Sequence, residues 1–144
     1  MAVLKDHKEP WPTQTARELG YAFNGYLLDA DRRPTFMYTL GSATVGDGSA
    51  IVGETFEPIA GKRPGMLRTV HISGNIKGPV VRVAVGKQIK EVKSDERRLW
   101  YDVDGLYRVK ADSTVIRSTA DGMELLVIVC AMKSGTSASI EYAW

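Results

Sequence analysis

The chain has 144 residues, of which 44% are apolar and 25% are charged, and its formal net charge is +2. A chain of this length can bury one hydrophobic core without disulfides or a structural metal, and its composition is that of a folded domain. The near balance of charges gives no electrostatic reason to expect a nucleic acid or an anionic membrane surface as a partner.

The single cysteine, Cys130, excludes an intrachain disulfide and any metal site made of several cysteines. It lies in the apolar run 125–132, so we expect it to be buried as a small hydrophobic residue. No apolar run approaches the ~20 residues that a membrane span needs. The first residues contain no secretory signal, and the chain stops abruptly on a strand, which suggests a module cut from something longer.

Only one segment, residues 12–20, predicts a helix. Pro12 and Thr13 are typical of a helix start and Gly20 of a helix end, with room for two turns at most. We therefore divide the chain into an N-terminal lead, residues 1–20, and a main domain, residues 21–144. Trp11 stands between two prolines and is expected to anchor the lead on the main domain.

From residue 21 onward the sequence alternates apolar and polar residues, or forms short apolar runs between turn residues. About ten strands follow at spacings near ten residues: 23–29, 35–40, 51–59, 67–73, 80–85, 87–93, 99–103, 106–110, 114–117, 123–132 and 137–144. Without intervening helices, this pattern predicts an all-β fold, an antiparallel β-sandwich. We expect its own side chains to fill the interior, leaving no room for a reaction centre.

The common catalytic and cofactor motifs are missing from the sequence, including GxGxxG, Walker A, HExxH, GxSxG and CxxCH. We therefore expect no catalytic residue, no metal and no cofactor in this segment. His71 stands mid-strand on the face opposite to Val70 and Ile72, so it should be an exposed or rim residue. As an alternative, His71 would ligate non-covalent haem together with Met37 or Met66, a choice that the spacing leaves open.

The candidate binding surface combines aromatic and basic residues near two turns. Trp100 and Tyr101 precede the turn at residues 104–105, and Tyr107 follows it; because neighbouring strand residues point to opposite faces, one of Trp100 and Tyr101 should point outward. With Arg97, Arg98 and Arg108 nearby, an exposed ring here would stack on a sugar or receive a partner domain. Simple cross-strand packing on the sheet surface is the interpretation that the pattern favours, and a binding surface is the alternative.

Two more expectations concern the arginines in the first hairpin turn and the apolar residues of the last strand. Arg32 and Arg33 stand in the turn of the first hairpin, and we include them in the partner surface. Ile140, Tyr142 and Trp144 share one face of the last strand, so we expect all three in the core.

The chain also resembles a domain of large haem-containing, dehydrogenase-like proteins of planctomycete-type bacteria. The residues that carry the resemblance are Trp11, Pro12, Gly20, Tyr21, Leu28, Asp29 and the segments 23–26, 33–38, 67–70, 83–86, 124–127 and 140–144. In those proteins this region accompanies a sugar-dehydrogenase-like β-propeller that uses pyrroloquinoline quinone and a c-type cytochrome domain. The resemblance thus implies a periplasmic or extracellular location and a parent oxidoreductase.

The resemblance transfers no catalytic residue to this chain, because the haem-attachment cysteines and the propeller's cofactor residues have no counterparts here. The expected function is a non-catalytic accessory domain that docks with or positions the neighbouring domains of its parent. A carbohydrate-binding module and a non-covalent haem-binding domain are the alternatives.

Overall fold

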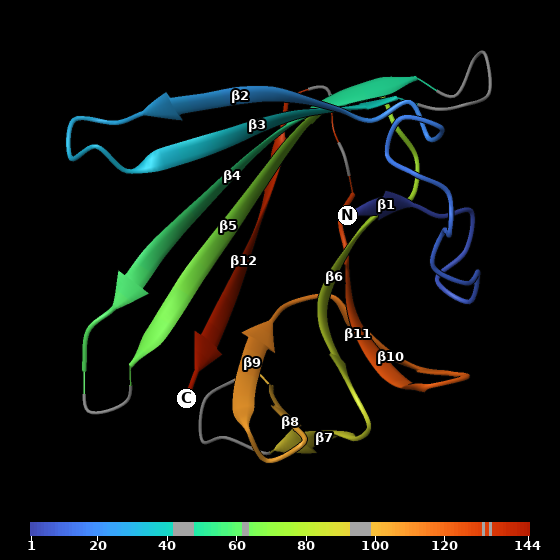
Figure 1. Cartoon of the computed structure of the whole chain (residues 1–144), viewed down its shortest axis with the longest axis vertical. Helices are drawn as coiled ribbons and strands as arrows, with labels where there is room; N and C mark the ends of the chain where they lie inside the picture. Colours follow the sequence, from blue (N-terminus) through green and yellow to red (C-terminus); the bar gives the residue numbers. More distant parts are fainter. Residues whose placement is uncertain (42–47, 62–63, 93–98, 131, 133) are drawn as a thin grey trace.

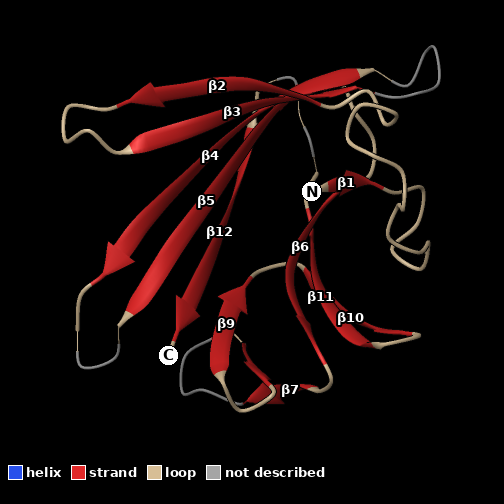
Figure 2. Cartoon of the chain, in the orientation of Figure 1, coloured by secondary structure: helices blue, strands red, loops and turns tan. Residues whose placement is uncertain are grey.

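The computed structural model describes residues 1–41, 48–61, 64–92, 99–130, 132 and 134–144. Over this part the chain is all β, in two sheets whose named strands pair antiparallel (Figures 1 and 2). The predicted fold class, an antiparallel arrangement resembling a sandwich, is confirmed. Among the described residues, no helix is long and apolar enough to cross a membrane.

The larger sheet has eight strands in the order β2-β3-β4-β5-β12-β9-β8-β7. Their bounds are Ala22–Leu28 (β2), Pro34–Gly41 (β3), Ser49–Ile59 (β4), Gly65–Gly74 (β5), Thr136–Ala143 (β12), Tyr107–Ala111 (β9), Trp100–Val103 (β8) and Ile89–Val92 (β7). The smaller sheet has the order β1-β6-β11-β10. Its strands are Ala2–Val3 (β1), Pro79–Gly86 (β6), Gly122–Ile128 (β11) and Thr114–Thr119 (β10).

The prediction of a helix at residues 12–20 is wrong, because the segment forms only a turn. Its start signal is present: Thr15 N donates to Glu18 Oε2 at 2.7 Å, and Glu18 N donates to Thr15 Oγ1 at 3.4 Å. One helical hydrogen bond follows, from Leu19 N to the Thr15 carbonyl. Gly20 then turns the chain at a φ of 73°. Forming the first turn of a helix fixes the backbone angles of several residues in return for one hydrogen bond. Because the chain turns at Gly20, no further α-helical hydrogen bonds follow to offset that cost, and the turn does not grow into a helix.

The lead, residues 1–20, contributes β1 to the smaller sheet, where Ala2 pairs with Val80 of β6. Trp11 packs on a small buried cluster on the outer face of that sheet, formed by Ala2, Leu4, Val80 and Leu126. The Arg82 guanidinium lies 4.3 Å from the centroid of the Trp11 ring. The expected anchoring role of Trp11 is confirmed.

The main core lies between the two sheets, because alternating residues of both point inward. Its largest fully buried apolar side chains are Ile72, Leu125, Ile140, Val52, Val70, Val81, Val103, Val109 and Val127. Leu126, which belongs to the outer cluster, is also fully buried. Ile140 and Tyr142 are buried as expected, but Trp144 is 57% exposed, so its assignment to the core is wrong. Trp144 lies one residue beyond the end of β12, outside the strand.

Cys130 is exposed, and the expectation that it is buried is also wrong. The apolar run around it is longer than the strand: β11 ends at Ile128, two residues earlier. Outside the ladder, period-two alternation no longer fixes which way a side chain points.

The larger sheet extends beyond the smaller one. In Figure 1 its strands fan out, and the β2–β3 hairpin points away from the smaller sheet. The burial pattern agrees, since every residue of β2 is exposed except Gly25, which is half-buried. Part of the inner face of the larger sheet is therefore left uncovered.

Candidate functional site

The uncovered inner face carries a strip of aromatic side chains across β2, β3 and β4. Strand register places Phe23 beside Tyr38, and Tyr26 beside Phe36. The ring centroids are 5.4 Å apart for Phe23 and Tyr38, 6.3 Å for Tyr26 and Phe36, and 6.1 Å for Phe36 and Phe56. These separations suit tilted and edge-to-face ring contacts. We call these five residues the aromatic strip.

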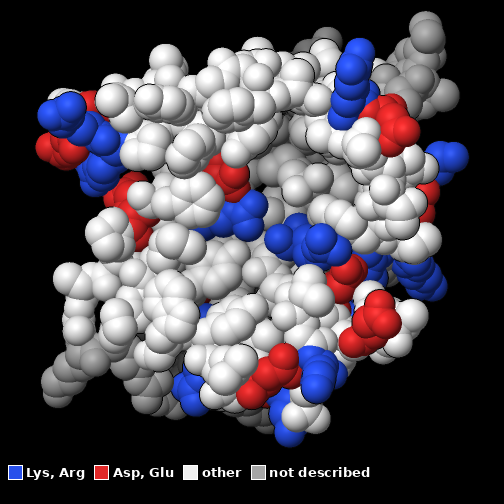
Figure 3. Space-filling model, viewed as in Figure 1, with Lys and Arg blue, Asp and Glu red and all other residues white. Residues whose placement is uncertain are grey.

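Two cavities open along this face, of about 320 and 430 Å³. The first is lined by Met1, Ala16, Tyr21, Ala22, Phe23, Tyr38, Leu40, Val52, Glu54 and Arg68, and the second by Glu54, Phe56, Met66, Arg68, Tyr107, Tyr142 and Trp144. Glu54 and Arg68 line both, so the two cavities adjoin at this pair of residues, and we refer to them together as the groove. Figure 3 shows this side of the molecule hollowed, with basic and acidic side chains adjacent inside the hollow.

Arg68 and Glu54 form an ion pair on the groove floor. Arg68 Nε donates to Glu54 Oε1 at 2.5 Å, and the two side chains are 17% and 11% exposed. Arg68 Nη1 lies 3.5 Å from the Tyr142 hydroxyl, which donates to the Val83 carbonyl at 3.2 Å. The guanidinium also lies 5.9 Å from the centroid of the Phe56 ring. These contacts fix the pair in one position.

Electrostatics favour the charged form of Arg68. Burial alone would lower the pKa of Arg68, but the Glu54 carboxylate and the Tyr142 hydroxyl outweigh it, and the pKa is raised. Burial, followed by the charge of Glu54, raises the pKa of Tyr38, and burial, followed by Tyr142, raises the pKa of Tyr107. The groove therefore offers the Arg68–Glu54 ion pair and phenol hydroxyls between apolar walls.

The aromatic residues predicted near the turn at 104–105 take separate places. Tyr101 is buried and hydrogen-bonds to Thr114 Oγ1, whereas Trp100 is half-buried on the opposite face, with Lys110 Nζ 5.3 Å from its ring centroid. The expectation that one of the pair points outward is confirmed for Trp100. Tyr107 lines the second cavity. Arg97 and Arg98 lie outside the described residues.

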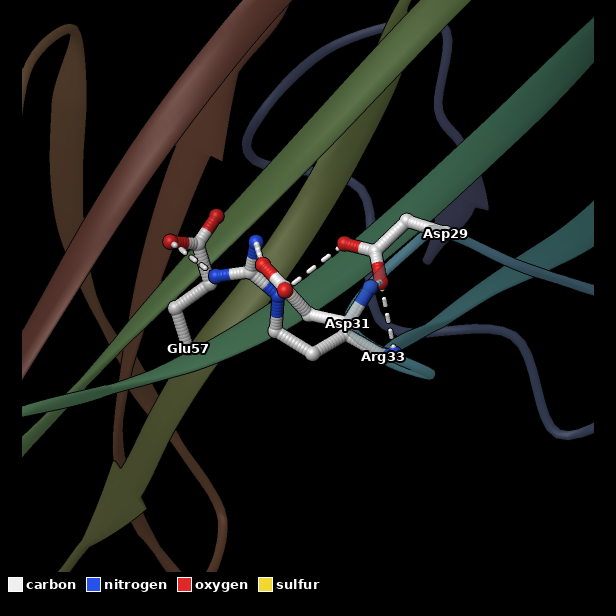
Figure 4. Close-up of polar contacts among 4 residues, drawn as sticks. All are labelled: Asp29, Asp31, Arg33 and Glu57. Carbon is white, nitrogen blue, oxygen red and sulfur yellow. Dashed lines mark hydrogen bonds and ion pairs between the residues drawn. The ribbon is translucent and has the colours of Figure 1, made fainter.

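Arg32 and Arg33 lie at the tip of the β2–β3 hairpin, where Arg32 has a φ of 61°. Arg33 is surrounded by carboxylates: its N–O distances are 2.9 Å to Asp29, 2.8 Å to Asp31 and 3.6 Å to Glu57 (Figure 4). Three strands, β4, β5 and β12, separate this hairpin from β9 and β8. The structure therefore does not bring the two arginines together with Trp100, Tyr101 and Tyr107 in one site.

His71 is exposed, as expected, and its Nδ1 lies 3.0 Å from Ser137 Oγ. Met66 is five residues earlier on the same strand and lines the groove, so it faces away from His71. Met37 lies on the same outer face of the larger sheet as His71, and Gly53 of β4 lies between the two residues. Within the described part of the chain, no group of three His, Cys, Asp or Glu side chains could hold a metal ion.

Sequence reasoning missed the central residues of the groove, Glu54 and Arg68, although the alternation contained the signal. Val52 and Val70 are core residues, and Glu54 and Arg68 each stand two positions away on the same strand. Residues two apart share a face. Two opposite charges at inward positions of consecutive strands therefore indicate an ion pair inside the sheet's concave side.

Comparison of the chain with protein-family models, with curated proteins and with solved structures finds no match. Two features of the larger sheet distinguish it as a candidate binding surface. One is the open groove around Arg68 and Glu54, and the other is the exposed edge strand β2.

Proposed function

We propose that this chain is a non-catalytic β-sandwich domain that docks with a neighbouring protein domain through the edge strand β2 and positions that neighbour. The resemblance described above suggests the neighbour: the dehydrogenase-like or cytochrome part of a larger periplasmic redox protein. The composition and exposure of β2 carry the docking part of the proposal.

The strand β2 supports docking because it combines an open backbone edge with apolar side chains. Among the strands that the structure describes, it pairs only with β3, so one row of its backbone N–H and C=O groups has none of these strands beside it. Phe23, Tyr26, Leu27 and Leu28 are 59%, 59%, 65% and 53% exposed. Large exposed apolar side chains gathered on one element mark interaction surfaces.

The opposite edge of the same sheet provides the contrast. The edge strand β7 has the sequence Ile-Lys-Glu-Val, and its two charged residues, Lys90 and Glu91, are exposed. Such charges protect an edge from pairing with another chain. The seven residues of β2 contain no charge. A bulge between Phe23 and Gly25 is the one protective feature of that strand.

Binding to isolated partner domains tests the proposal. A c-type cytochrome domain and a quinoprotein propeller domain from the proteins that the chain resembles are titrated with it by calorimetry and by thermal unfolding. We expect one of them to bind and to raise the unfolding temperature of the mixture, because burying the β2 surface stabilises both folded partners.

A matched pair of variants locates the contact. Leu27→Lys places a charge near the end of β2, and Val85→Lys places one at a comparably exposed apolar residue of the smaller sheet (56% exposed). Leu27→Lys should abolish binding, whereas Val85→Lys should preserve it. If neither domain binds, or if both variants weaken binding equally, docking through β2 is refuted.

A further inference from the structure

We infer that the groove around Arg68 and Glu54 binds a neutral oligosaccharide, with these two side chains holding adjacent hydroxyl groups of one sugar unit and the groove's aromatic rings stacking on its neighbours. This inference goes beyond the docking proposal: the groove lies on the inner face of the larger sheet, whereas docking uses the β2 edge, and Phe23 belongs to both surfaces.

The charges in the groove favour a neutral ligand. Arg68 and Glu54 are opposite charges in contact, and Glu54 carries the only carboxylate side chain among the described residues that line either cavity. Met1 also lines the first cavity, and burial lowers the pKa of its α-amino group, which weakens the positive charge there. An anion near Arg68 would also meet Glu54, and a cation near Glu54 would also meet Arg68, so neither is attracted strongly. A neutral ligand incurs no such repulsion.

The hydrogen-bonding groups of the pair favour hydroxyls on that neutral ligand. The contacts of Arg68 with Glu54 and Tyr142 use Nε and Nη1, and those of Glu54 use Oε1. Within the described part of the chain, this leaves Arg68 Nη2 as a donor and Glu54 Oε2 as an acceptor beside the cavities. Since each hydroxyl both donates and accepts, two adjacent hydroxyls of a sugar can satisfy both groups.

A purely apolar occupant fits less well. A lipid chain or an apolar peptide side chain would remove water from Arg68 and Glu54 without replacing its hydrogen bonds. Burying charged groups in this way is costly even when they are paired. A ligand that offers hydroxyls to the pair and apolar surface to the walls avoids that cost.

The walls provide the apolar surface on both sides of the pair. Phe23 and Tyr38 line the first cavity, and Tyr107 and Trp144 line the second. The C–H faces of sugar rings are apolar and pack on such aromatic rings. Each cavity lies within the ~300–1,000 Å³ range of small-molecule sites. Cavities on both sides of the central pair suit a chain of sugars better than a single one.

The test is a titration with neutral oligosaccharides of gluco-, xylo-, manno- and N-acetylglucosamine type. Binding is monitored by calorimetry and by tryptophan fluorescence. Oligogalacturonate, an acidic oligosaccharide, is the charged comparison. We expect one neutral series to bind, with affinity rising from one sugar unit to longer chains. Binding by none of the neutral series, or stronger binding of the acidic one, overturns the inference.

Variants assign the binding to the groove. Trp144→Ala removes a ring that is 57% exposed, so it should leave folding intact and weaken binding about tenfold. Trp100→Ala removes the outward-facing ring and should change nothing, and unchanged binding by Trp144→Ala would overturn the inference. Leu27→Lys separates the two proposals, because it should retain saccharide binding even where it abolishes docking.

Discussion

Arg68 of β5 and Glu54 of β4 are diagonal neighbours: Glu54 pairs in register with Val70, and Arg68 with Phe56. Their charged groups meet where the smaller sheet no longer covers the larger one, with cavities on both sides. The same two residues therefore stabilise the sheet and form the floor of the proposed sugar site.

Removing one member of this pair should destabilise the fold more than removing both. Glu54→Gln and Arg68→Met should each lower the free energy of unfolding by about 1–3 kcal/mol, because the remaining charge loses its partner in a mostly buried position. The double variant should recover much of that loss. Urea unfolding of all four proteins measures the coupling, and additive effects would show that the two charges do not interact.

Two glycines with the same backbone angle should respond differently to substitution. Gly78 and Gly105 both have a φ of 70°. A Cβ on Gly105 would meet no atom within 4 Å, whereas a Cβ on Gly78 would lie 2.0 Å from the Leu4 carbonyl oxygen. Gly105→Ala should therefore cost about 1–2 kcal/mol for the left-handed backbone alone.

Gly78→Ala should cost clearly more and should displace β1, because the Leu4 N–H donates to the Gly78 carbonyl at 2.9 Å. Thermal unfolding compares the two costs, and hydrogen exchange of the Val3 and Leu4 amides reports on β1. Equal losses of stability in the two variants would contradict the close approach between Leu4 and Gly78.

Stability should fall in acid through Glu124. This buried carboxylate accepts hydrogen bonds from Arg117 and Arg82. Burial alone would raise its pKa, but the hydrogen bonds and charges of the two arginines outweigh burial and lower the pKa below 4.5. Because the folded state binds the proton less tightly than the unfolded state, this stabilisation is present above pH 4.5 and is lost as the pH falls through the folded pKa.

The measurement is the difference in unfolding free energy between wild type and Glu124→Gln from pH 7 down to pH 3. That difference should be large at neutral pH and should shrink in acid, once Glu124 itself is protonated. Glu91→Gln, on the exposed edge strand β7, is the control and should give a small difference at every pH. A difference for Glu124 that stays constant would refute its role.

Arg33 should matter little for stability despite its three carboxylate partners. Arg33 and two of those partners, Asp29 and Glu57, are 44–47% exposed. Surface ion pairs contribute little to stability, so Arg33→Ala should change the unfolding free energy only slightly. High salt should remove most of the effect. Chemical unfolding at low and high salt measures the effect, and a large loss of stability that persists at high salt would contradict this expectation.

Local patterns predicted the strands well, because alternation and turn residues act between near neighbours in the chain. The hairpin of β2 and β3 was expected at residues 23–29 and 35–40 and lies at Ala22–Leu28 and Pro34–Gly41. Two patterns that suggested longer elements gave wrong predictions. The start at Thr15 and Glu18 makes one turn, and the apolar run that contains Cys130 extends beyond β11.

The candidate site was predicted only in part. Tyr107 lines the groove, but Trp100 faces the other side and Arg33 belongs to the hairpin tip. Alternation specifies which residues share a face, yet it does not specify how far the second sheet covers that face. The expectation of a completely filled interior missed the groove for this reason.

The sequence by itself determined the all-β class, the positions of most strands and the inward direction of Val52, Val70 and Ile140, since period two and turn chemistry are local properties. Only the tertiary structure decided that β2 lies at an edge and that the smaller sheet ends before it covers the larger one. Those features depend on pairings between strands distant in the chain, whose order no local pattern encodes.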